Sequence, residues 1–137
     1  MQNKASWPET GTLLRVLLVS ALVALGIQYF LGIEVNMYVE APYSSTDLLF
    51  SSHYSLGILV VAIGMGVLAV SILTRKPFAV LASLVAFVAM ATAGQAGRVY
   101  TFSSHVESYS LIMAVAFLVA FASYFVEIIL LSRSPAP

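Results

Sequence analysis

Four long apolar runs constrain what this chain can fold into more than any other feature. They cover about residues 13–33, 53–74, 78–96 and 105–131, and the second and third contain no charged residue. A helix needs roughly 20 apolar residues to cross ~30 Å of hydrocarbon. Strands of a transmembrane barrel would instead alternate in polarity over about ten residues. The runs therefore predict an all-α protein with four membrane-spanning helices.

Charged residues are scarce. Six Lys and Arg balance six Asp and Glu among 137 residues, of which 61% are hydrophobic. A soluble domain is about a quarter charged, so this composition excludes an ordinary soluble enzyme and a nucleic-acid-binding domain with a basic face. The absence of cysteine excludes disulfides, thiolate metal sites and iron–sulfur clusters. We expect an integral membrane protein in contact with the lipid bilayer and with no nucleic-acid partner.

The connections between the runs are of unequal length. A tight turn is predicted at 74–77, where Pro77 suits the first turn of the third helix. The longest connection is the 34–52 loop, in which a Ser-Ser-Thr-Asp cluster at 44–47 is typical of a cap or turn. Short connections make sequential helices antiparallel neighbours. Residues 1–137 are thus expected to form one membrane domain, an up-down-up-down four-helix bundle.

Basic residues predict the orientation of the bundle. In an up-down-up-down bundle, five of the six basic residues lie at the end that carries both termini, and only Arg98 lies at the other. Cytoplasmic segments carry the excess of Lys and Arg. Both termini are therefore expected in the cytoplasm and the 34–52 loop outside, in the plasma membrane. The run at 13–33 is expected to be a retained span, because it is long for a signal peptide and no small-x-small cleavage site follows it.

Both histidines of the chain are predicted at the outer membrane surface. His53 begins the second run and His105 begins the fourth, and these two helices can lie diagonally across a bundle. Two facing imidazoles are what bis-histidine haem b requires, one on each axial position of the iron. Gly57, one turn below His53, leaves room for a flat macrocycle, and Arg98 is placed to pair with acidic propionates. His53, His105, Gly57 and Arg98 are therefore the candidate haem-binding residues.

Simpler explanations exist for each of these residues. An interfacial histidine can face water or a lipid headgroup, and a glycine can serve close helix packing. The third run carries a small-residue stripe, for which packing is the favoured explanation: Ala82, Ala86, Ala89, Ala93 and Gly97. Glu127 lies about one turn from the inner end of the fourth run. Arg15, Arg75 or Lys76 is its expected ion-pair partner, and a structural pair is favoured over a proton relay.

Short motifs in the last three runs resemble those of a known family. They are the segment at 53–57, His-Tyr-Ser-Leu-Gly, the Ala-rich run after His105, and Gly-Gln-Ala-Gly at 94–97. These features resemble one four-helix half of the haem A synthase family, whose second and fourth helices ligate haem b through histidines. The resemblance implies that His53 and His105 are the iron ligands.

The chain departs from that family in two features. The glutamate that the family carries shortly before its first histidine is absent from 48–52, and so is the external cysteine pair. The usual doubled form would need a dimer of four-helix units. Gln28, Gly32 and Asn36 also resemble a Gln-x3-Gly-x3-Asn pattern of small uncharacterised four-helix membrane proteins, which implies no function.

Two classes of function follow from the sequence. The first is a b-type haem protein that acts in respiratory electron transfer or in chemistry similar to haem A synthesis. The second is a non-catalytic subunit or assembly factor, bound to a respiratory or other membrane complex or to a second copy of itself.

Overall fold

The computed structural model describes residues 7–37, 43–102 and 107–133, and all of them except the turn at 75–76 are helical. The helices are α1 (Trp7–Met37), α2 (Tyr43–Thr74), α3 (Pro77–Phe102) and α4 (Glu107–Arg133). Each contains a segment long and apolar enough to cross a membrane: Thr10–Val35, Leu48–Thr74, Pro77–Tyr100 and Glu107–Arg133. The predicted all-helical fold with four candidate membrane spans is confirmed for the described part of the chain.

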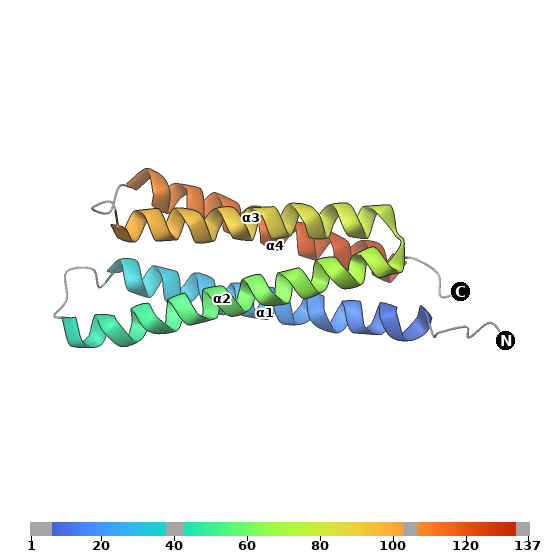
Figure 1. The fold of residues 1–137 in the computed structure, drawn as a ribbon, viewed down its shortest axis with the longest axis horizontal. Helices are drawn as coiled ribbons and strands as arrows, with labels where there is room; N and C mark the ends of the chain where they lie inside the picture. Colours follow the sequence, from blue (N-terminus) through green and yellow to red (C-terminus); the bar gives the residue numbers. More distant parts are fainter. Residues whose placement is uncertain (1–6, 38–42, 103–106, 134–137) are drawn as a thin grey trace.

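The four helices pack lengthwise around one core (Figure 1). Contacts join α1 to α2, α2 to α3, α3 to α4 and α4 to α1, so α2 lies diagonally opposite α4. The most extensive contact is between α3 and α4. α1 begins and α4 ends at the same end of the bundle as the turn between α2 and α3 (Figure 1).

The helices extend further than the apolar runs. α1 continues to Met37 and α2 already begins at Tyr43, so the long loop predicted at 34–52 is wrong for most of its length. The Ser-Ser-Thr-Asp cluster at 44–47 lies inside the first turns of α2 and not before them. α3 likewise continues through Gly97 to Phe102. A helix that leaves the hydrocarbon needs no apolar side chains, so hydropathy marks where the membrane ends and not where the helix ends.

The turn between α2 and α3 forms where it was predicted. α2 ends at Thr74 and α3 begins at Pro77. Arg75 adopts a left-handed backbone with φ of 56°, and its N–H donates to the Ile72 carbonyl at 3.1 Å. A residue in this conformation ends a helix by satisfying one of its last carbonyls.

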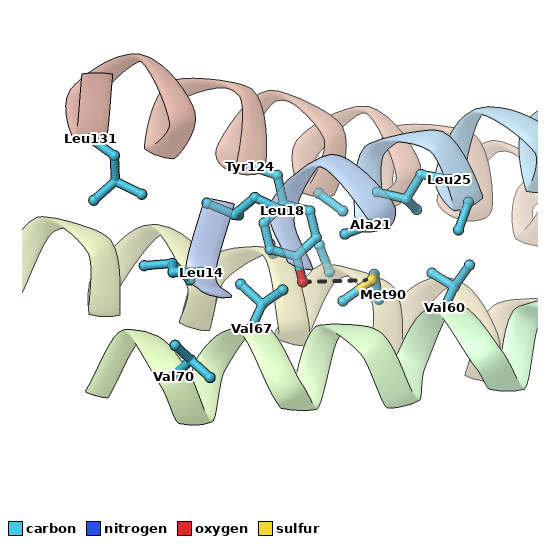
Figure 2. Close-up of a cluster of buried hydrophobic side chains, with 14 residues drawn as sticks. Leu14, Leu18, Ala21, Leu25, Val60, Val67, Val70, Met90, Tyr124 and Leu131 are labelled. Atoms are coloured by element: carbon cyan, nitrogen blue, oxygen red, sulfur yellow. Dashed lines mark hydrogen bonds between the residues drawn. The ribbon is translucent and has the colours of Figure 1, made fainter. Parts of the chain in front are cut away.

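The core of the described residues is a cluster of mostly alanine, valine and leucine side chains (Figure 2). Leu14 and Leu18 of α1, Val67 of α2, Ala86 of α3 and Tyr124 of α4 are among its most buried members. Large apolar side chains on every helix remain exposed, as a bilayer-facing surface requires.

The small-residue stripe of α3 serves close packing, as favoured from the sequence. Ala86 and Ala89 are buried, and so are Ala116 and Ala120 on α4, the helix that contacts α3 most extensively. A Cβ at Gly97 would lie 3.0 Å from the Met113 sulfur of α4. Small residues let two helix backbones approach closely where lipid supplies no hydrophobic driving force.

Candidate functional site

A compact polar cluster lies in the described core near the α2–α3 turn. Ser71 of α2, Ser83 of α3 and Glu127 of α4 are each fully buried. The two serine oxygens lie 2.7 Å apart. The Ser71 hydroxyl lies 2.9 Å from one carboxyl oxygen of Glu127, and the Ser83 hydroxyl lies 2.7 Å from the other. The cluster therefore links three helices, and it joins α2 to α4 across the diagonal of the bundle.

The position of the turn brings the two serines together. Ser71 lies one turn before the end of α2, and Ser83 lies in the second turn of α3. Their placement on either side of a tight turn puts them at the same height of the bundle. α4 then supplies Glu127 at that height. Neither serine was selected from the sequence, although each is a hydroxyl in an otherwise apolar and uncharged run beside the turn.

In the described part of the chain, the hydrogen-bond partners of Glu127 are these two hydroxyls and not the basic side chain expected from the sequence. Arg15 of α1 points elsewhere, because its Nη2 donates to the main-chain carbonyl of Leu131 at 3.1 Å. Lys76 is exposed. The last carbonyls of a helix have no partner within the helix, so a guanidinium near the end of α4 satisfies one of them. Arg15 thus binds the end of α4, and Glu127 binds the two serines.

One turn from Glu127 along α4, the side chain of Tyr124 fills the centre of the bundle. Its hydroxyl lies 4.0 Å from the Met90 sulfur of α3, and Figure 2 shows this contact inside the apolar cluster. Both side chains abut Gly64 of α2, where an added Cβ would meet the Met90 methyl group and lie 2.8 Å from the Tyr124 hydroxyl. Gly64 lies two turns beyond Gly57 on α2, and the space beside it is filled by these two side chains.

The predicted outer site contains a second, smaller polar contact between α1 and α2. The Nε2 atoms of Gln28 and His53 lie 3.4 Å apart, so the amide N–H donates to the ring. A Cβ at Gly32 would lie 3.1 Å from the His53 ring, and one at Gly57 would lie 3.2 Å from the Gln28 amide. The two glycines therefore provide the room in which the two polar side chains pack.

The described residues offer a haem only part of what it needs. His53 has a buried Nδ1 without a hydrogen-bond partner. Its ring, however, packs against Gly32 of α1, so ligation of iron on the α4 side requires the ring to leave this position. Arg98 is exposed on α3, and His105 lies outside the described residues. No group of three or more His, Cys, Asp or Glu side chains in the described ranges is arranged to hold a metal ion.

An open apolar groove of about 650 Å³ runs along the outside of the α3–α4 pair. The lining side chains are Leu84, Val85, Val88, Ala89, Thr92, Leu111, Ile112, Val115, Ala116 and Val119. Thr92 is the polar member, and its hydroxyl donates to the Val88 carbonyl of its own helix at 2.9 Å. The groove therefore presents an apolar surface along its whole length.

Comparisons with protein-family models, with curated proteins and with solved structures find no match to this chain.

Proposed function

We propose that this protein is a non-catalytic subunit or assembly factor of a larger membrane complex, and that the α3–α4 groove receives a helix of a partner membrane protein. The groove is the observation that carries the proposal. Eight of its ten lining residues are alanine or β-branched. β-branched side chains are stiff, and small ones admit a second helix at close range. Such a surface loses little side-chain entropy when a helix packs on it.

The same proposal gives the bundle an up-down-up-down topology in the plasma membrane, with both termini in the cytoplasm. The beginning of α1 and the end of α4 lie at the end of the bundle where α2 turns into α3, which supports it (Figure 1). That turn carries Arg75 and Lys76, which belong on the cytoplasmic side by the distribution of positive charge.

Site-directed photo-crosslinking in native membranes tests the proposed partner. A photoreactive residue at Val115, which is 52% exposed in the groove, should give a discrete protein adduct. The same residue at Val23, 58% exposed on α1, should not. V88W fills the groove and should abolish the adduct, whereas V16W on α1 should preserve it. Adducts with lipid alone would overturn the proposal, and an adduct with a second copy would replace the partner by a homodimer.

A b-type haem held by His53 and His105 is the second candidate function, in electron transfer or in chemistry similar to haem A synthesis. The partnerless Nδ1 of His53 favours it. Haem supplied during expression should give purified protein with Soret and α bands in its reduced-minus-oxidised spectrum, and H53A and H105A should each remove them. Q28A is the matched control: it frees the ring of its amide contact and should leave the bands in place. A spectrum without these bands, or bands unchanged in both histidine variants, would contradict haem binding.

A further inference from the structure

The polar cluster of Ser71, Ser83 and Glu127 has more short contacts than an ionised glutamate can satisfy. Its three oxygen–oxygen distances are 2.7, 2.7 and 2.9 Å, and each is a hydrogen-bond distance. A hydrogen bond needs one proton between its two oxygens. Each serine hydroxyl carries one proton, and an ionised carboxylate carries none. Two protons cannot occupy three contacts.

Any arrangement of those two protons leaves one contact without a hydrogen. If both hydroxyls donate to the carboxylate, the oxygens of Ser71 and Ser83 face each other at 2.7 Å with only lone pairs between them. If one serine donates to the other, a carboxylate oxygen faces a bare hydroxyl oxygen instead. A third proton, on the carboxyl group, removes the conflict. Glu127 then donates to one serine, that serine donates to the other, and the second serine donates back to the carboxyl.

In the described part of the chain, the hydrogen-bond partners of Glu127 are Ser71 and Ser83, and neither carries a positive charge in place of that proton. Tyr124, one turn away on α4, directs its hydroxyl to the Met90 sulfur. Arg15 of α1 donates to the Leu131 carbonyl. An ionised acid in the hydrocarbon core costs several kcal/mol unless it is paired, so the neutral form is the one that full burial favours.

We propose that Glu127, Ser71 and Ser83 form a proton-binding site, in which Glu127 holds an exchangeable proton within a closed ring of three hydrogen bonds. The ligand is a proton and not a metal cation. Loss of the proton leaves two hydrogens for three contacts and drives Ser71 and Ser83 apart. The site thereby links proton release to the packing of α2 against α3 beside their turn. This inference is independent of the groove and of haem.

Carbodiimide labelling of the full-length protein in neutral detergent solution tests the site. Dicyclohexylcarbodiimide adds to a protonated carboxyl group, and the product keeps every atom of both reactants as an N-acylurea. At pH 7 only about one exposed glutamate side chain in 500 carries a proton. Peptide mass spectrometry should therefore find Glu127 labelled many times faster than the exposed Glu34 and Glu107. Labelling no faster than at those residues would overturn the proposal, and so would strong slowing by Na⁺ or K⁺, because it would make the ligand a metal cation.

Infrared difference spectroscopy gives an independent readout. The spectrum of the wild-type protein minus that of E127Q should contain the carbonyl band of a protonated carboxylic acid. S71A and S83A should each keep the band and shift it to higher frequency, because each variant loses two of the ring's three hydrogen bonds, one of them to the carboxyl group. Circular dichroism checks that each variant is folded. A carboxylate band in place of the acid band would overturn the proposal, and an acid band that neither serine variant moves would refute the closed ring.

Discussion

Replacing Gly64 by alanine should lower the free energy of unfolding by about 1–3 kcal/mol, the usual cost of overpacking a filled core. The added methyl group would meet the Met90 methyl group and lie 2.8 Å from the Tyr124 hydroxyl. The Met90 side chain can turn its end away, but it is 4% exposed and has little free volume to enter. Tyr124 is fully buried and less able to move. G64L should therefore prevent assembly of the bundle altogether.

Gly66 provides the matched control on the same helix. A Cβ at Gly66 meets nothing within 4 Å. G66A should stabilise the protein by about 0.5–1 kcal/mol, since alanine loses less backbone entropy than glycine in a helix. Equilibrium unfolding in mixed micelles, followed by circular dichroism, measures both variants. Equal effects of G64A and G66A would show that the contact with Tyr124 and Met90 does not limit packing.

The double variant G64A/M90A should be more stable than the sum of the two single effects predicts. M90A alone removes a buried side chain and leaves a cavity, at a cost of about 2–5 kcal/mol. The alanine at position 64 then points into that cavity and recovers part of the lost contact. Residues that share one space are coupled in this way, whereas distant ones are additive. Additive effects would mean that the two side chains do not share it.

E127A should lower the free energy of unfolding by about 2–4 kcal/mol. It removes two interhelical hydrogen bonds, each worth roughly 0.6 kcal/mol in a membrane, and it opens a cavity where three helices meet. S71A and S83A each remove one hydroxyl and should cost only about 1 kcal/mol. Unfolding in mixed micelles ranks the three variants. A smaller effect of E127A than of either serine variant would contradict the central position of the carboxyl group.

Removing the whole polar cluster should be far less damaging than removing its centre. The triple variant S71A/S83A/E127L leaves no buried polar group without a partner and fills the space with apolar atoms. Replacing a whole buried polar cluster by apolar side chains of similar volume often leaves the stability unchanged or raises it. We therefore expect the free energy of unfolding of the triple variant to lie within about 1 kcal/mol of the wild-type value or above it. A triple variant as unstable as E127A would show that the hydrogen bonds of the cluster themselves stabilise the bundle. The cost of E127A would then not come from leaving the two serines without a partner.

The four helices could be predicted from the sequence because many residues in each run contribute to its hydropathy. The turn at Thr74–Pro77 was also predictable, since a proline and two bases interrupt otherwise apolar sequence. The end of α1, the beginning of α2 and the end of α3 could not be predicted. A helix continues in water without the apolar side chains that mark it in the membrane. Gly97 follows the predicted apolar run and yet lies inside α3. One glycine inside a helix costs only about 1 kcal/mol and does not end it.

The candidate site was less predictable because side-chain direction depends on helix rotation. The sequence placed His53 at the correct end of α2, but it does not specify that the ring packs against Gly32 of α1. It singled out Glu127 as an unusual acid and then assigned it a basic partner by proximity in depth. The actual partners are Ser71 and Ser83. Serines are common in apolar helices. The rotation of α2 and α3 about their axes determines that these two serines face Glu127, and the sequence does not specify that rotation.

The contact between Arg15 and Leu131 bears on how the protein is assembled. It joins the beginning of the first helix to the end of the last, 116 residues apart in the chain. α4 is synthesised after the other three helices, so the α1–α4 contact can form only once all four have been made. The stack of Tyr29 on Phe117, with ring centroids 5.0 Å apart, belongs to the same contact. The polar cluster likewise depends on α4, because Glu127 is the last of its three members to be synthesised.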